Sequence, residues 1–514
     1  MKKVFKKRAP TPSYISPSQL TMDCFQSPFE QELNPTNRWV VLSRLMPWDE
    51  VCNLYLKNVG VSPTGRPPLS PRVIIGSMII KHLCNLDDRE TVDQISENIY
   101  MQYFLGYSSF SSAPPFDASL FVDFRKRLSM ENMNAINERI VFLKTKLESK
   151  KNNSEPPSDQ DRNDSAESEN KGRVIFDATA CPQDISYPTD LDLISESREK
   201  TEQLIDLLYN SGLHQNKPRT YRRIARKRYL KTAQKKNKSR KEIRKSVGSQ
   251  LRFLRRNLIS INRLLDAYPQ IPLKPKQHKY LLVVNTLYVQ QKQMYDSKTH
   301  SVEDRIVSIH QPHVRPIVRG KSQAKVEFGA KIHVSIIDGI SFLDELSWDA
   351  FNEGSHMMDY VEQYRKRFGC YPKELLADQI YCTRANRAAL KEKGIKLLAK
   401  PLGRPSAVPN HVSPGERNPI EGKFGQAKTG YGLNRIKARL RVTSESWIAC
   451  IFLVLNLVKL AGAALPCLIV RSVISFSAKE IFDRLGQNAD QIKVQIIFYR
   501  QILNLYPIKL KIPV

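Results

Sequence analysis

Hydrophobic and polar positions divide the chain into a helical first part and an alternating second part. Between residues 31 and 150, apolar residues recur every three to four positions, which is the spacing of one helix face. The strongest signal is the apolar run from Val73 to Leu83, behind a serine and a proline that favour a helix start. Further helices are predicted from Thr91 to Phe104 and from Asp117 or Ser119 to Leu147. We expect an all-α N-terminal domain over 31–150, preceded by a flexible arm over 1–30.

The segment 151–172 breaks this pattern. Between residues 152 and 170 it has six acids and no aliphatic side chain larger than that of alanine, so it cannot bury enough apolar surface to fold. We predict a disordered acidic linker there. Beyond it, short β-type runs alternate with helical stretches up to about residue 465, which is typical of an α/β domain with a mixed sheet. The sequence thus predicts an α/β domain over 173–465 and a C-terminal tail over 466–514.

One apolar run in this second part resembles a membrane helix in length. Ile448 to Val470 is almost wholly apolar and approaches the ~20 residues that span a bilayer. Asn456, Lys459 and Pro466 interrupt it, and the mean hydropathy of the whole chain is −0.42. We expect a helix packed in the core and no membrane partner.

Charge points to a polyanionic partner. The 514 residues carry a formal net charge of +30, with a pI near 9.7, and DNA or RNA is the commonest polyanion that such proteins bind. The segment 217–256 alone has 18 lysines and arginines and one acid, Glu242. A solvated helix face is the plain alternative, but one acid cannot neutralise so many cations within the segment. We predict a helical hairpin with a basic tip that contacts phosphates through a cluster of five cations: Arg222, Arg223, Arg226, Lys227 and Arg228.

The cysteines and the first residues bear on the compartment. Eight cysteines are present without a C-x-x-C pair or a matching histidine cluster, so neither a zinc site nor a disulfide framework is predicted. The basic start of the chain has no apolar run behind it, unlike a secretory signal. We expect a cytoplasmic protein.

Three acids are candidates for chemistry. Asp177 and Asp378 each follow a short hydrophobic strand, where the carboxyl edge of a parallel sheet binds ligands. Glu421 lies in a predicted helix, and Arg417 and Lys428 fall on nearly the same face as it does. Oxygen ligands alone suit Mg²⁺ or Mn²⁺. Two such ions would support in-line displacement at phosphorus.

Each acid also has a structural interpretation. Asp177 and Asp378 could each cap a turn, and the stretch Asn418-Pro419-Ile420-Glu421 matches a capping box with proline at the first helical position. From the residues alone, both interpretations stay open.

Several stretches resemble bacterial insertion-sequence DDE transposases, of the family named after insertion sequence five. They include VIFDATACPQDISYPTDL, LSWDAFNE, LLADQIYCTRANRAAL and RNPIEGKFGQAKTGYG, and the resemblance runs from about residue 35 to about residue 465. It implies a ribonuclease H-like catalytic core in which Asp177, Asp378 and Glu421 match the catalytic, metal-binding acids. It also implies double-stranded DNA as partner, binding of the terminal repeats of an element, and cleavage with strand transfer. We expect the N-terminal domain over 31–150 to be a DNA-binding domain that reads bases, because its successive short helices could form a helix-turn-helix. A homodimer on DNA, associated with the bacterial nucleoid, is the natural expectation.

The family also has a motif of the form Tyr-x2-Arg-x3-Glu-x6-Lys. Arg417, Glu421 and Lys428 fit its spacing, whereas Pro414 stands at the tyrosine position. The resemblance therefore implies DNA contacts by Arg417 and Lys428. It also makes the segment from about 190 to about 300 a basic helical insertion between core strands.

Two rival functions remain at this point. One is a DNA-binding protein whose catalysis has decayed, which the presence of all three acids argues against. The other is a ribonuclease H-fold nuclease that cuts without strand transfer, since both reactions use the same metals.

Overall fold

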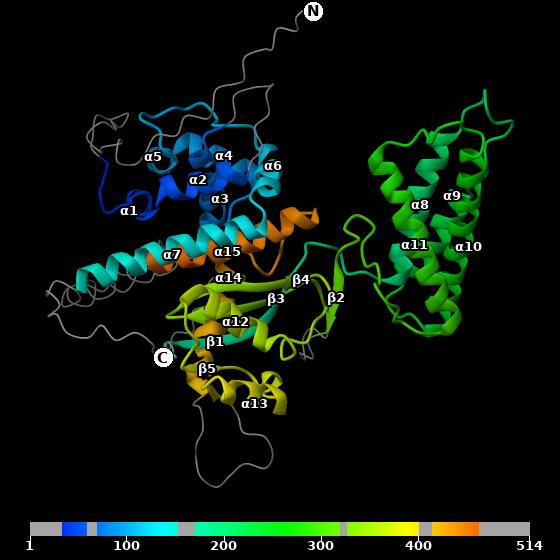
Figure 1. Cartoon of the computed structure of the whole chain (residues 1–514). Coiled ribbons are helices and arrows are strands. Elements are labelled where there is room, and N and C mark those ends of the chain that lie inside the picture. Colours follow the sequence, from blue (N-terminus) through cyan, green and yellow to red (C-terminus); the bar gives the residue numbers. More distant parts are fainter. Residues whose placement is uncertain (1–32, 59–68, 153–169, 319–325, 400–413, 462–514) are drawn as a thin grey trace, which may run out of the picture. The chain divides into compact units, whose positions relative to one another are not determined.

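The computed structural model describes residues 33–58, 69–152, 170–318, 326–399 and 414–461 (Figure 1). The chain forms two compact units, Met1–Leu457 and Val458–Val514. The predicted arm over 1–30 and the tail over 466–514 lie outside the described residues, as does most of the acidic linker. The described end of that linker binds the α/β part, since the Asn170 side chain donates to the Lys393 carbonyl over 2.8 Å.

The described residues before the linker form helices joined by turns and loops. They are α1 (Arg38–Leu45), α2 (Trp48–Asn58), α3 (Pro71–Cys84), α4 (Asp88–Glu97), α5 (Ile99–Leu105), α6 (Leu120–Arg127) and α7 (Met130–Asn152). The prediction of a single helix over 91–104 is wrong. The Asn98 side chain accepts hydrogen bonds from the Tyr100 and Met101 amides, and it thereby caps the start of a new helix, α5. The helix expected over 119–147 is likewise two helices, with α6 ending before Leu128.

The last of these helices joins the helical part to the sheet. On α7, the Asn137 side chain donates to the Ser341 carbonyl over 3.3 Å, and Asn456 of a later helix donates to Asn137 over 2.9 Å. These three residues are buried, so their polar groups satisfy one another inside the protein. The N-terminal helices and the sheet therefore belong to the same compact unit.

The described residues of the second part include a mixed six-stranded sheet. Its strands are β1 (Arg173–Pro182), β2 (Arg315–Val318), β3 (Val326–Ile337), β4 (Ile340–Ser347), β5 (Glu374–Leu376) and β6 (Lys396–Leu398). The order is β2-β3-β1-β5-β6, and β4 also pairs with β3. Strand β1 is antiparallel to β3 and parallel to β5, and β5 is parallel to β6. The mixed α/β class predicted from the sequence is confirmed.

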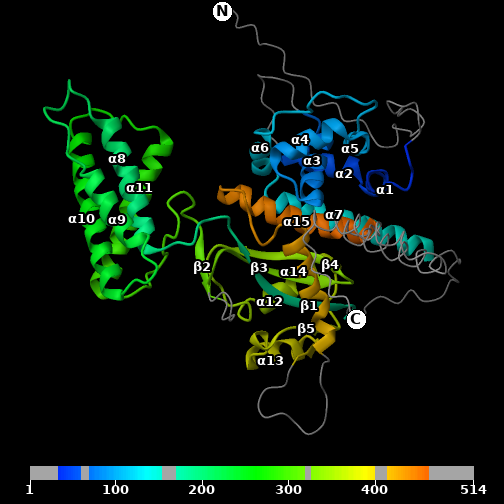
Figure 2. The same ribbon diagram turned by 180° about the vertical axis from the view of Figure 1, so that it is seen from behind.

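Four helices interrupt the sheet between β1 and β2 (Figure 2). They are α8 (Asp190–Leu208), α9 (Arg222–Ala233), α10 (Arg240–Leu265) and α11 (Pro275–Ser297). Apolar residues of α8, α10 and α11 share one buried cluster, which includes Ile205, Leu254 and Val284. The predicted basic hairpin corresponds to α9 and α10, and α8 and α11 complete a four-helix insertion around it.

The remaining elements follow β4. They are α12 (Met357–Phe368), the 3₁₀ turn η3 (Gln379–Tyr381), α13 (Arg384–Glu392), the 3₁₀ turn η4 (Pro414–Arg417), α14 (Asn418–Gly430) and α15 (Arg441–Ala461). Within the described ranges, α15 alone is long and apolar enough to cross a membrane by length and composition, and 72% of its apolar window is buried. Core helices of soluble proteins pass the same test, so α15 is weak evidence for a span.

Candidate catalytic site and basic surface

Strand register brings Asp177 and Asp378 to the same level of the sheet. The last parallel pair between β1 and β5 is Ile175 with Leu376, and each aspartate stands two residues beyond its member of that pair. Asp378 follows its strand, as predicted. The expectation that Asp177 also ends a strand is wrong: β1 continues to Pro182, because β3 pairs with it along that whole stretch.

One arginine contacts both carboxylates. Arg417 Nη1 lies 3.0 Å from Asp378 Oδ1, and Arg417 Nη2 lies 3.5 Å from Asp177 Oδ2. The side chains of Asp177 and Arg417 are 21% and 22% exposed, against 58% for Asp378. The site is therefore half-closed, with one open acid and one sheltered acid.

The sheltered acid has a perturbed pKa. Burial raises the pKa of the Asp177 carboxyl above its usual value, and the negative charges of Asp378 and Glu353 act in the same direction. The Ala178 amide, which donates to Asp177 Oδ1 over 2.8 Å, and the Arg417 guanidinium oppose the rise. A nearby cation therefore helps to keep this carboxyl ionised.

The structural interpretations of the acids have different outcomes. Asp378 does cap a turn, since its side chain accepts from the Gln379 amide over 2.8 Å at the start of η3. The predicted capping box of Glu421 is wrong, because α14 begins at Asn418 and its N-cap is Arg417, without a side-chain cap bond. Glu421 thus lies exposed on the first turn of α14. Lys428 lies half-buried on the last turn of the same helix.

The two aspartates fit a hard divalent cation. Both present carboxylate oxygens to one cationic group, the Arg417 guanidinium, and carboxylates are the ligands that Mg²⁺ and Mn²⁺ prefer. The Arg417 Nε atom is buried and has no hydrogen-bond partner, so this guanidinium is incompletely satisfied. Within the described ranges, no three His, Cys, Asp or Glu residues come close enough to hold a metal together. Glu421 is therefore not yet part of a three-acid cluster.

Sequence reasoning missed a second ion pair near these acids. Lys331 of β3 pairs with Glu353, and its ammonium donates to the Phe351 carbonyl over 2.7 Å. Both side chains are less than one-fifth exposed. The only signal was the stretch LSWDAFNE in the family resemblance, because an acid in a loop after a strand has no local signature.

The Glu353 loop is fixed against the Asp378 loop. The Asn386 side chain donates to the carbonyls of Gly354 and Tyr381 over 2.7 and 2.9 Å. A Cβ at Gly354 would clash with the Ile380 carbonyl oxygen, so glycine allows the two backbones to approach closely. This packing holds the loop that carries Glu353 against the residues that follow Asp378.

The five cations of the predicted basic cluster all lie exposed on α9. A few cations of the segment have acid partners, one of which lies outside the segment. Asp206 of α8 pairs with Lys217 and Arg222, each over 2.8 Å, and Glu242 pairs with Lys235 over 2.6 Å. The other four cations of the cluster have no ion pair to any described acid, so the surface keeps a large positive excess.

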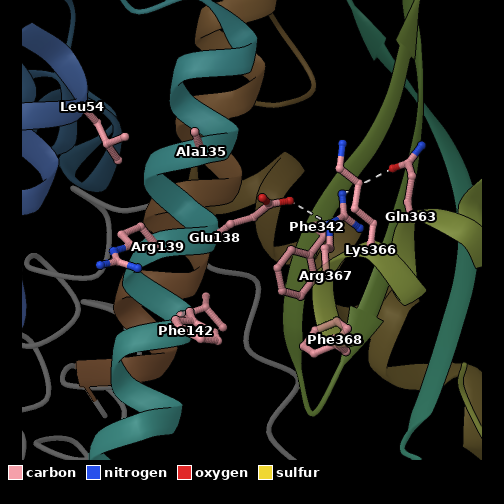
Figure 3. A pocket seen from close by; sticks show the side chains of 11 residues that line it. Leu54, Ala135, Glu138, Arg139, Phe142, Phe342, Gln363, Lys366, Arg367 and Phe368 are labelled. Carbon is pink, nitrogen blue, oxygen red and sulfur yellow. Dashed lines mark hydrogen bonds and ion pairs between the residues drawn. The ribbon is translucent and has the colours of Figure 1, made fainter. Parts of the chain in front are cut away.

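A separate pocket lies between α7, β4 and α12 (Figure 3). Its volume is about 820 Å³. Phe142, Phe342 and Phe368 line it, together with Arg367, which pairs with Glu138 over 2.7 Å. It contains none of the predicted site residues.

Two family models match parts of the chain. Residues 27–127 match the family described as "Transposase domain (DUF772)", and residues 375–458 match "Transposase DDE domain". The uncharacterized protein ORF8 in the nfe locus of Rhizobium meliloti is 29% identical over 177 residues, which are 34% of this chain and 75% of that protein. No solved structure matches the chain.

These matches support a DNA transposase enzyme with a DDE domain. A DDE domain implies a ribonuclease H-like fold, generally depends on a divalent metal, and makes DNA the partner. Asp378 and Glu421 fall inside the second match, whereas Asp177 and the helical insertion lie outside both. Membership of the family named after insertion sequence five stays a prediction.

Proposed function

We propose that this protein binds the terminal inverted repeats of an insertion sequence and catalyses metal-dependent DNA cleavage and strand transfer. The observation that carries the proposal is the pair Asp177 and Asp378, which stand level on neighbouring parallel strands and share Arg417. Acids at this place in a sheet, within a DDE transposase chain, are suited to phosphoryl transfer.

The chain's own residues have distinct roles in this proposal. Asp177, Asp378 and Glu421 would hold the metal, one or two Mg²⁺ or Mn²⁺ ions. The metal would supply activation of the attacking oxygen and neutralisation of charge at phosphorus. Arg417 and Lys428 would position the scissile phosphate through charge-assisted hydrogen bonds. Glu421 is exposed on the first turn of α14 and does not cluster with the aspartates, so the proposal requires that it joins them once DNA is bound.

The helical insertion has a different role. Its exposed cations on α9 would bind the phosphate backbone without reading sequence. Base reading is assigned to the N-terminal helices, whose short successive helices resemble a helix-turn-helix in length. The match of residues 27–127 to a transposase domain supports a role for these helices in transposition.

A cleavage assay tests the proposal. Purified full-length protein is incubated with a labelled element end and Mg²⁺, and the products are mapped at nucleotide resolution. We expect nicks at the element boundary and joined products with a target plasmid. Nicks without joining would indicate a nuclease, and binding without nicks would indicate a protein that has lost catalysis.

A further inference from the structure

Arg417 occupies the space between two residues that must hold metal under the proposed function. Its two terminal nitrogens lie 3.0 Å from an Asp378 oxygen and 3.5 Å from an Asp177 oxygen. Two carboxylates that face each other repel, and a cation between them relieves the repulsion. A guanidinium does so well because its planar fork reaches two acceptors at once. Arg417 thus does for the free protein what a divalent cation would do.

The Arg417 side chain is placed so that it can move away from the two aspartates. It ends η4 and stands at the N-cap of α14, with no side-chain cap bond to hold it. Its Nε atom is buried without a hydrogen-bond partner, so moving the guanidinium breaks no hydrogen bond at this atom and lets it find one elsewhere. Its ion pair with Asp378 is also accessible to solvent, since the Asp378 side chain is 58% exposed.

We propose that Arg417 is an internal cation that competes with the divalent metal for Asp177 and Asp378, and that a DNA phosphate draws it away. The inference rests on the proposed function. Metal and guanidinium cannot occupy the same gap, because their charges repel and their ligands are the same oxygens. A phosphate offers Arg417 an equivalent bidentate partner. DNA binding and metal binding therefore favour each other.

The coupling has a defined thermodynamic form. If DNA raises the affinity for metal by some factor, metal must raise the affinity for DNA by the same factor. The free protein would then assemble its reactive site only on DNA. Arg417 is a positioning residue in this scheme, and its effect is visible in metal binding without any turnover.

Mn²⁺ binding to the full-length protein tests the inference, with free Mn²⁺ measured by electron paramagnetic resonance. Arg417→Gln keeps a polar side chain but removes the cation. Without DNA, we expect this variant to bind Mn²⁺ about 10-fold more tightly than the wild type. A short duplex should raise the wild-type affinity by a similar factor and that of the variant hardly at all. Equal affinities of wild type and variant without DNA would overturn the inference.

Two further variants complete the design. Arg435→Gln is the matched control, because Arg435 pairs with an aspartate elsewhere, Asp184, over 2.9 Å and is 67% exposed; its Mn²⁺ affinity should equal that of the wild type. Arg417→Lys keeps the charge but loses the fork that spans both carboxylates, so its affinity without DNA should fall between those of the wild type and Arg417→Gln. If Arg417→Gln does not fold, an unchanged affinity of Arg417→Lys overturns the inference.

Failure of the inference and failure of the proposed function are separable. Asp177→Asn and Asp378→Asn should each lose Mn²⁺ binding if these acids hold the metal. Unchanged Mn²⁺ binding in both would reject the metal site itself and with it the proposed function. Loss of binding in both, with no effect of Arg417→Gln, would reject only the role of Arg417.

Discussion

The edge of the sheet and the helical insertion both concentrate charge, but they arrange it in opposite ways. At the sheet edge, acids and cations pair, as Arg417 does with Asp177 and Asp378. On α9 and the start of α10, exposed cations outnumber the acids that pair with them. Among the described residues of the insertion, these acids are Asp206 and Glu242. Paired charges fix a geometry, whereas unpaired charges create a field that acts over a Debye length. The first arrangement suits chemistry and the second suits attraction of DNA.

The largest expected effect is a loss of cleavage without a loss of DNA binding, which would assign chemistry to the sheet edge and DNA attraction to other cations. Asp177→Asn and Asp378→Asn should each lower the cleavage rate by about 10³-fold or more, because each removes a charged metal ligand. Glu421→Gln should do the same. DNA affinity, measured by fluorescence anisotropy, should stay near the wild-type value, since backbone contacts come from cations elsewhere.

Asp184→Asn is the control for these variants. Asp184 is an exposed acid that pairs with Arg435 rather than with the site, so its loss should leave cleavage unchanged. A variant of Asp177, Asp378 or Glu421 that cuts at nearly the wild-type rate would remove that residue from the catalytic set.

The two arrangements also differ in how far sequence predicts them. The basic surface follows from composition, because exposed like charges depend only on local residues. The site depends on residues far apart in the chain, such as Asp177 and Arg417. Family resemblance could name those residues, but no local pattern could predict that one guanidinium joins both aspartates.

The errors of prediction arise where residues outside a short stretch decide its structure. The strand was expected to end at Asp177, but pairing with the distant strand β3 extends it. The capping box at Glu421 failed because the turn η4 moves the N-cap of α14 back by one residue, to Arg417. Asp206 neutralises Arg222 from another helix, which a count within one segment could not include. A tertiary contact overrode the local preference at Asp177 and at Arg222, whereas at Glu421 the neighbouring turn η4 did so.

The α9 cluster should account for much of the salt dependence of DNA binding. Replacing the five cations of the α9 cluster with glutamine should flatten the slope of log affinity against log salt by several units, at about 0.9 per lost phosphate contact. Arg222 should contribute least, since Asp206 already neutralises it. Cleavage at saturating DNA should persist. All sequences should be weakened alike, so the preference for the element end over random DNA is kept.

Lysines on another helix of the same insertion are the control. Lys276 and Lys279 are exposed on α11, and their replacement with glutamine should leave the slope nearly unchanged. An unchanged slope in the α9 variant would mean that the cluster faces solvent or a protein. Loss of preference for the element end would mean that it reads bases.

A third, smaller effect is expected at Lys428. Lys428→Ala should lower the strand-transfer rate by about 10- to 100-fold, because it removes one cation beside the scissile phosphate. Mn²⁺ affinity should change much less. Lys428→Arg should recover part of the rate, since it restores the charge. An equal loss of Mn²⁺ binding would mean that Lys428 supports the metal site rather than the phosphate.

The smallest expected effect is at Glu242, the one acid of the basic segment. Its pairing with Lys235 and its hydrogen bonds with Ser239 lower the pKa of this exposed carboxyl to about 2, so any stability it adds is present above its usual pKa and is lost as pH falls through about 2. It therefore stays ionised wherever DNA binding is measurable. Glu242→Gln keeps a side chain able to form the capping box at the start of α10 but removes the charge. DNA affinity should rise about two- to five-fold, with a salt slope steeper by less than one unit, and the gain should be equal at pH 5.5 and pH 8.

Glu199→Gln on α8, a partly exposed acid paired with Arg198, should change neither quantity. A gain at Glu199 as large as that at Glu242 would show that DNA responds to the net charge of the insertion rather than to the surface formed by α9 and α10.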